Sequence, residues 1–316
     1  MTTLPNIQIY KFNFIIQCLD DTMLPEYKGS LLRGVFGTAF RQATCITKEK
    51  TCDNCIIKNN CSYFNVFETE IPDNDAWFLK GIKKTPHPYV IHPPLDNKQV
   101  YKKGELIAFG VTIFGKYIKD FPYFVYAFIL AGKIGISVRR SKFKLLFVDN
   151  ITLTESIRIF NDDSGQLLSK YKTIDINEFD SEQKEIRTLT LNFVTPLRIQ
   201  ELGLFKDKNK ITPELIIRTI ERRIFVISNL FCDYKTEDYK TYINDSLKIS
   251  NNNLYFYNWE RFSNRQNTKM QMGGFKGTLT LTGNFTDFYP LIKLGSYTNI
   301  GKNSAFGLGQ YEVIVY

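Results

Sequence analysis

Four of the six cysteines lie close together in the first fifth of the 316-residue sequence. Cys45, Cys52, Cys55 and Cys61 are spaced C-x6-C-x2-C-x5-C, and four thiolates at this spacing can converge on one tetrahedral ion. The set predicts zinc in a structural role, because four protein ligands leave no coordination position open. An iron–sulfur cluster uses the same number of ligands, and a group of unrelated or redox-labile thiols is a further alternative.

The sequence contains two histidines, His87 and His92, and each is followed by a proline. A residue that precedes proline is biased toward an extended backbone, so both histidines are expected in extended segments. An imidazole titrates near neutral pH and can take a proton from a reacting hydroxyl. His87 and His92 are therefore the candidate catalytic residues, with loop histidines that do no chemistry as the alternative.

A third set of residues has the chemistry to bind phosphate. Segment 295–310, GSYTNIGKNSAFGLGQ, contains glycines whose backbone can turn N–H groups toward an anion, and one lysine. A flexible hairpin loop is the alternative. Basic residues also recur in the first helix, in the turn 133–144 and in the segment 257–269. The candidate phosphate-binding residues are Arg33, Arg41, Arg139, Arg140, Lys142, Arg261, Arg265, Gly301, Lys302, Gly307 and Gly309.

The charge and composition limit the class of protein. Hydrophobic residues make up 43% of the chain and aromatic residues 15%, which excludes a disordered chain, and a net charge of +9 favours an anionic partner such as nucleic acid or an acidic membrane surface. The apolar run 123–136 is too short to cross a bilayer, and no signal peptide is visible at the N-terminus. A soluble, cytoplasmic protein is therefore expected.

The predicted elements follow a repeated order. The first half reads as a strand at 7–19, a helix at 30–43 with Ser30 as its N-cap, a strand at 105–115, an aromatic–Pro–apolar helix, and a strand at 143–148. The second half reads as a strand at 186–199, a helix at 213–231 with Thr212 as its N-cap, a strand at 275–283, a similar helix and a last strand at 311–316. Gly34 and Gly37 in the first helix suggest close packing there.

With one more strand after the first helix of each half, this order is β-α-β-β-α-β twice, which predicts an α+β protein of two tandem ferredoxin-like domains. We expect the first domain at 1–160, with the four cysteines in an insertion, a polar linker at 161–185, and the second domain at 186–316. The glycine-rich segment then lies between the last helix and the last strand of the second domain. Its weaker counterpart is the basic turn after Gly132 in the first.

Several segments together resemble a known family. They are GSLLRGVFGTAFR with the cysteines that follow it, PHPYVIHPP, LAGKIGISVRR, LNFVTPLRI, WERFSNRQ and, most specifically, GSYTNIGKNSAFGLGQYEV at the C-terminus. The chain resembles CRISPR-associated precursor-RNA processing endoribonucleases of the RAMP superfamily, in a cysteine-containing branch. The resemblance covers most of the chain in the family's order.

This resemblance implies that the protein binds CRISPR repeat RNA and cuts it without a catalytic metal, leaving a 2′,3′-cyclic phosphate. It also implies delivery of the guide RNA to an effector complex. Family members often carry a histidine on or just after the first helix, and this sequence has none there. A fold that returns His87 or His92 to that helix would supply the base; otherwise catalysis must rely on tyrosine and lysine side chains, or the protein binds RNA without cutting it. The alternative function is that of a non-catalytic RAMP subunit that binds RNA in an effector complex.

Overall fold

The computed structural model describes residues 4–68, 85–180, 185–201, 204–205, 207–233, 243, 246–263 and 268–316. The chain divides into two compact units, one of Gln8–Ile174 and one of Met1–Ile7 with Asp175–Tyr316. The division falls inside the interval 161–185. Within the described residues, no helix is both long enough and apolar enough to span a bilayer.

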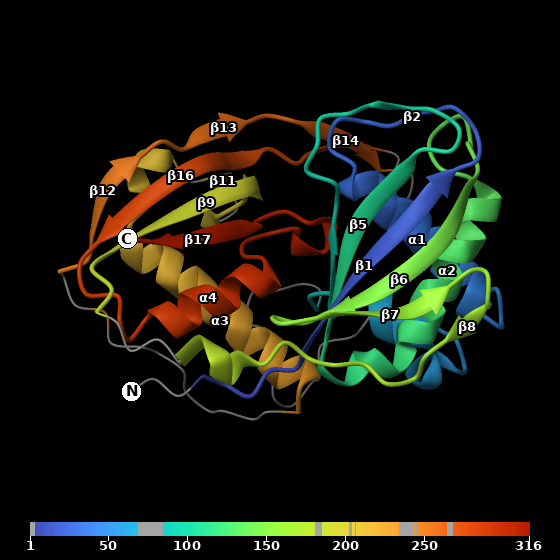
Figure 1. Ribbon diagram of the computed structural model, residues 1–316, viewed down its shortest axis with the longest axis horizontal. Coiled ribbons are helices and arrows are strands. Elements are labelled where there is room, and N and C mark those ends of the chain that lie inside the picture. The colour runs from blue at the N-terminus through green and yellow to red at the C-terminus, as the bar shows by residue number, and fades with distance from the viewer. Residues whose placement is uncertain are drawn as a thin grey trace. The chain divides into compact units, whose positions relative to one another are not determined.

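The first unit, Gln8–Ile174, is a six-stranded antiparallel sheet with two helices packed on one face (Figure 1). Its strand order is β3-β5-β1-β6-β7-β8. The strands are β1 Ile9–Cys18, β3 Tyr89–His92, β5 Leu106–Phe114, β6 Phe143–Ile151, β7 Ser156–Asn161 and β8 Gln166–Leu167. The helices are α1 Gly29–Thr44 and α2 Phe121–Ile134, and the short strands β2 Thr22–Met23 and β4 Val100–Tyr101 form a separate ribbon.

Aromatic side chains form the core of the first unit. Alternate residues of the central strand β1, including Phe12 and Phe14, are fully buried, as expected for a strand with one face on a core. Phe36 of α1 and Phe128 of α2 stack with ring centroids 5.2 Å apart, and Phe14 lies 5.1 Å from Phe128. Both helices are thereby fixed against β1, the central strand.

The second unit contains a sheet of order β12-β16-β9-β17, with β13 also paired to β16, and all of its pairs are antiparallel. Its core contains both aliphatic and aromatic side chains, and α3 contributes a row of fully buried isoleucines. The elements are β9 Thr188–Leu197, α3 Pro213–Phe231, β12 Lys248–Asn252, β13 Tyr255–Tyr257, β16 Gly274–Thr282, α4 Tyr289–Thr298 and β17 Tyr311–Val315. Two-stranded ribbons join β10 Gln200–Glu201 to β11 Leu204–Phe205, and β14 Glu260–Ser263 to β15 Thr268–Gln271.

The two units share one topology. In the first, the strands β1, β3, β5 and β6 with their two helices follow the order β-α-β-β-α-β, and β1 lies between β5 and β6. In the second, β9, β12, β16 and β17 follow the same order, and β9 lies between β16 and β17. This is the strand arrangement of the ferredoxin-like unit. The predicted α+β class with antiparallel sheets is therefore confirmed.

The helix caps agree with the sequence in one case out of two. Thr212 is the N-cap of α3, its side chain accepts from the Leu215 N–H at 3.1 Å, and Pro213 occupies the first helical position. The predicted cap of α1 was wrong: the helix begins at Gly29, Lys28 is the N-cap residue, and no side chain caps it. Ser30 lies inside the first turn of α1, because the helix extends one residue further than the apolar pattern indicates.

Candidate active site

His87 returns to the first helix. The Arg33 side chain, on α1, places Nη2 2.8 Å from His87 Nε2, and His87 Nδ1 lies 3.2 Å from the backbone oxygen of Val66. A guanidinium can only donate, so Nε2 accepts, and Nδ1 carries the hydrogen that it donates to Val66. The two contacts together fix one neutral tautomer and one ring orientation of His87.

Aromatic rings surround this pair. Val66 and Phe67 belong to a π-helical turn, η2 Phe64–Glu68, that follows the cysteine segment. The Arg33 guanidinium lies 5.3 Å from the centroid of the Phe67 ring, and His87 stacks on Tyr89 with centroids 5.5 Å apart. A guanidinium over a ring gains a cation–π attraction, so η2 holds both members of the pair.

The two glycines of α1 differ in their surroundings. A Cβ at Gly37 would lie 3.2 Å from the Phe67 ring, whereas a Cβ at Gly34 would meet nothing within 4 Å. The close packing suggested by the sequence is therefore present at Gly37, where η2 covers the helix, and absent at Gly34.

Tyr89 is fully buried beside the pair. Burial raises the pKa of Tyr89 to about 12, while the nearby Arg33 charge acts to lower it and Tyr63 to raise it. The phenol therefore keeps its proton at neutral pH. Its hydroxyl has no hydrogen-bond partner among the residues that the structure describes.

His92 lies on the other face of the sheet. It ends β3, and its Nε2 is 2.8 Å from the Oγ1 of Thr112, a buried residue of β5. Tyr89 faces the helices, and side chains alternate along a strand, so His92 points to the opposite side. The two candidate catalytic histidines are therefore not brought together, and only His87 reaches α1.

Arg41 is also engaged within the first unit. Its guanidinium donates to the backbone oxygens of Glu49 and Lys50 and lies 5.4 Å from the centroid of the Tyr63 ring. The face of α1 that carries Arg33, Gly37 and Arg41 is therefore covered by the segment that contains the cysteines and η2. The sequence pattern indicates an open basic face instead, because it does not show what packs on it.

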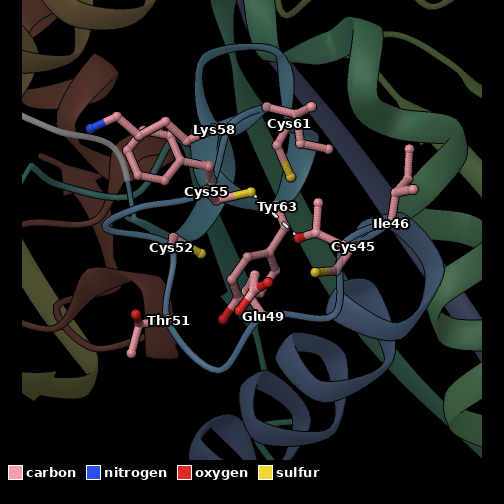
Figure 2. Close-up of a pocket in the computed structure, with 12 residues that line it drawn as sticks. Cys45, Ile46, Glu49, Thr51, Cys52, Cys55, Lys58, Cys61 and Tyr63 are labelled. Carbon is pink, nitrogen blue, oxygen red and sulfur yellow. Dashed lines mark hydrogen bonds between the residues drawn. The ribbon is translucent and has the colours of Figure 1, made fainter.

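The four cysteines line one pocket. Figure 2 shows the sulfurs of Cys45, Cys52, Cys55 and Cys61 pointing into the same space. Burial raises the pKa of the Cys52 thiol, with Glu68 acting in the same direction and Arg41 against it. In the part of the chain that the structure describes, no three His, Cys, Asp or Glu side chains are arranged closely enough to hold a metal ion. The pocket thus contains the predicted donor set without a closed metal geometry.

The basic turn between α2 and β6 is tightly built. Arg139 and Arg140 are exposed, and Arg140 has a left-handed backbone with φ +51°. Lys142 Nζ donates to the backbone oxygens of Lys133 and Ile134 at 2.6 and 2.9 Å. These carbonyls end α2, so Lys142 caps that helix, and Arg139 and Arg140 are the two predicted residues that the turn presents outward.

The glycine-rich segment is mostly buried rather than an open loop. Its first residues, Gly295–Thr298, belong to α4, so the loop proper begins at Asn299. The Gly309 N–H donates to Pro196 and the Gly307 N–H to Ser304. These two N–H groups, which the sequence offers to phosphate, are therefore already used inside the second unit.

The loop glycines serve the backbone conformation. Gly301 and Gly309 have φ of +81° and +73°, and a Cβ would approach the backbone oxygens of Arg198 and Ile300 to 2.5 and 1.7 Å. Lys302 is exposed at the tip, and its N–H donates to Arg198 O at 2.9 Å. Of the remaining candidates, Arg261 lies in β14, opposite Met270, and Arg265 lies outside the described residues.

Sequence reasoning missed the residues that hold His87. Val66, Phe67 and Tyr89 complete its surroundings, and none of them belongs to a polar motif. The sequence feature that could have indicated them is the aromatic-rich run after Cys61, YFNVF, because several aromatic rings in a short segment are expected to pack against another part of the protein.

Comparison with known proteins agrees with this fold. The family AF_1859_N, described as an N-terminal domain, matches residues 5–172, which is more than half of the chain. The family described as CRISPR-associated endoribonuclease Cas6 matches residues 191–311. An uncharacterized protein of Archaeoglobus fulgidus is 20% identical over 298 residues, with 92% of each chain covered.

Two solved structures share the fold. A partial Cas6-RT-Cas1–Cas2 complex superposes with a TM-score of 0.59 at 11% identity, and the match covers all of this chain and 47% of that one. The chain thus spans about half the length of this neighbour. Thermus thermophilus Cas6 (TTHB231) superposes with a TM-score of 0.53 at 12% identity, with 98% and 99% of the chains covered.

The two matched models follow one another along the chain, and the structural neighbours share both units of its fold. The chain belongs to the AF_1859_N family, which its residues 5–172 match, and its residues 191–311 match the family described as CRISPR-associated endoribonuclease Cas6.

Proposed function

We propose that this chain binds CRISPR repeat RNA and cleaves it by attack of a 2′-hydroxyl on the adjacent phosphate, without a catalytic metal. The observation that carries the proposal is the 2.8 Å contact between Arg33 Nη2 and His87 Nε2. The contact brings His87, which we assign as the general base, beside the positive charge of Arg33 on α1. Such a cleavage requires a base for the 2′-hydroxyl, a cation for the pentavalent transition state and an acid for the leaving 5′-oxygen, and this pair would supply the first two.

The contact also indicates how the pair works. The Arg33 guanidinium is a planar donor that binds phosphate oxygens well. When it turns to a non-bridging oxygen of the scissile phosphate, His87 Nε2 is released to take the proton of the 2′-hydroxyl. The hydrogen bond from Nδ1 to Val66 O keeps the ring oriented throughout.

Bond changes follow from this arrangement. The 2′-oxygen bonds to phosphorus, the bond to the 5′-oxygen breaks, and the leaving oxygen takes up a proton from water, while the proton that His87 accepted returns to the solvent. The products are a 2′,3′-cyclic phosphate and a 5′-hydroxyl. Arg33 stabilises the extra negative charge on the phosphorane while both bonds are partly formed.

RNA binding beyond the scissile phosphate is assigned to the exposed cations. Arg139 and Arg140 project from the basic turn of the first unit, and Lys302 from the tip of the glycine-rich loop of the second. Cations of this kind bind phosphates along a strand. One structural neighbour is a Cas6-RT-Cas1–Cas2 complex, so we infer that the cut RNA passes on to other CRISPR proteins.

The test compares His87→Gln with His92→Gln on a labelled repeat RNA in EDTA, where free Mg²⁺ is removed. We expect His87→Gln to bind the RNA normally and to cut it at least about a hundredfold more slowly. His92→Gln should cut at nearly the wild-type rate, because His92 lies on the opposite face of the sheet.

The outcomes separate the candidate functions. Intact RNA with the wild-type protein, despite tight binding, would identify a non-catalytic RAMP subunit. Equal cleavage rates for the wild type and His87→Gln would show that His87 is not the general base. Loss of cleavage in His92→Gln alone would place the chemistry on the other face of the sheet.

A further inference from the structure

We propose that the four thiols of the cysteine loop, residues 45–61, bind one Zn²⁺, and that the bound ion fixes the π-helical turn that orients His87. The second half of this inference rests on the proposed cleavage function, whereas the first half does not.

The donor set is concentrated in one place. The four sulfurs line a single pocket and point into it (Figure 2). Cys52 and Cys55 form a local turn in which the Cys55 N–H donates to Cys52 O at 3.2 Å. A C-x2-C turn of this kind supplies two ligands of a tetrahedral thiolate site.

The loop has no apolar core of its own, although Arg41 donates to the backbone oxygens of Glu49 and Lys50. Ile46 and Ile56 are 81% and 93% exposed, and the residues between the cysteines are mostly exposed and polar. A segment without an apolar core depends on a cross-link or a metal for its structure. No three of the described His, Cys, Asp or Glu side chains are close enough to hold an ion in this structure, so the proposal requires the exposed loop to contract around the ion.

Two of the four ligands are anchored on the core of the first unit. Cys45 directly follows α1, and its N–H donates to Arg41 O at 2.8 Å. On the other side, Ser62, which follows Cys61, donates its hydroxyl to Asp120 Oδ1 at 2.7 Å, beside α2. An ion shared by all four thiolates would therefore connect Cys52 and Cys55, in the middle of the loop, to the two helices near its ends.

The same loop leads directly into the candidate active site. The Asn65 N–H donates to Cys61 O at 3.0 Å, and the next residue, Val66, accepts from His87. Phe67 follows and packs under the Arg33 guanidinium. Whatever fixes Cys61 thus fixes the carbonyl that holds the His87 ring. A Zn²⁺ ion with four thiolate ligands has no open coordination position for substrate or water. Its contribution is therefore to position His87.

The first measurement is the metal content of the purified full chain, without RNA and without chelator. We expect about one zinc per chain, lost in Cys52→Ser and in Cys55→Ser. Cys232→Ala, which removes a buried thiol in the other unit, should keep the zinc. A chain that carries no zinc and takes up none from solution overturns the site, as does iron with acid-labile sulfide.

The second measurement separates binding from cleavage. Cys52→Ser and Cys55→Ser should bind repeat RNA with nearly unchanged Kd but cut bound RNA about tenfold to a hundredfold more slowly, because a base displaced by about 1 Å loses rate on this scale. Cleavage at the wild-type rate by variants that have lost zinc overturns the positioning role. A wild-type chain that holds zinc but cuts no RNA keeps the site and overturns the cleavage function, so the two failures are distinguishable.

Discussion

At the scale of single residues, the orientation of His87 is set by partners that are remote in sequence. Arg33 lies 54 residues earlier and Val66 lies 21 residues earlier. The sequence has no histidine on α1, and the one that reaches this helix comes from the segment that leads into β3.

Asp120 is a buried carboxyl whose ionisation should oppose folding. It is 4% exposed, Oδ1 accepts from Ser62, and Oδ2 has no partner in the described structure. Burial raises its pKa, while the Ser62 hydrogen bond and the Lys119 charge act in the opposite direction. The folded state therefore binds its proton up to a higher pH than the unfolded state does. The free energy of unfolding must fall as pH rises through that window.

We expect Asp120→Asn to raise the free energy of unfolding at pH 7 by about 1 kcal/mol, because the amide keeps the bond to Ser62 without a charge. The gain should vanish below the unfolded pKa of about 4, as urea unfolding at the two pH values would measure. Asp21→Asn is the control of opposite sign. Bonds from Lys102 and Lys103 lower the pKa of Asp21, so this variant should lose stability at pH 7 and none at low pH. Equal behaviour of the two variants would contradict the argument.

At the scale of elements, the glycines of the glycine-rich loop allow it to adopt one packed conformation rather than making it flexible. Asn299 and Ile300 are fully buried at its start, and Arg223 of α3 donates to the backbone oxygen of Thr298, the last residue of α4, at 3.2 Å. Burial lowers the pKa of Arg223 to about 10. The loop is therefore anchored on the core of the second unit, and its exposed tip carries Lys302.

Gly309→Ala should destabilise the second unit by about 3 kcal/mol, because alanine at positive φ is strained and its Cβ would overlap Ile300 O. Gly34→Ala is the matched control in α1. Its Cβ meets nothing within 4 Å, so the higher helix propensity of alanine should stabilise the chain by up to about 1 kcal/mol. Thermal unfolding of both variants measures the difference. A neutral Gly309→Ala would show that the loop is not packed as described.

The regular elements were largely predictable, and the irregular ones were not. Helix α3 has the predicted bounds because Thr212 and Pro213 mark its start and its isoleucines recur at helical spacing. The turn η2 was missed because its aromatic residues have no regular period. Strands β7 and β8 lie within or next to an interval whose polar composition indicates a linker. The sequence left undecided whether His87 contacts Arg33, because no local sequence pattern indicates a contact between residues far apart in the chain.

At the scale of the whole molecule, the positive charge is the property that should govern RNA affinity. The net charge of +9 acts through those cations that reach phosphate, and part of the basic set is already engaged inside the units. Arg41 and Lys142 hold backbone oxygens, whereas Arg139 and Arg140 are exposed.

We therefore expect Arg139→Ala/Arg140→Ala to weaken repeat-RNA binding and to reduce the slope of log K against log salt by about 1.4, or about 0.7 for each phosphate that an arginine no longer neutralises. Binding measured at several salt concentrations provides the slope. Lys142→Met is the control: it removes a cap of α2, so it should lower the stability of the first unit and leave the slope unchanged. If only Lys142→Met reduced the salt slope, Lys142 would be assigned the phosphate contact in place of Arg139 and Arg140.

The two His-Pro steps have a consequence for association between molecules. Strand β3 lies at the edge of its sheet, four residues long, with Pro88 before it and Pro93 after it. Proline offers no N–H to an incoming strand, and short edge strands flanked by proline resist strand addition. The segment that presents His87 and His92 thus also closes this edge of the sheet against aggregation with a second chain.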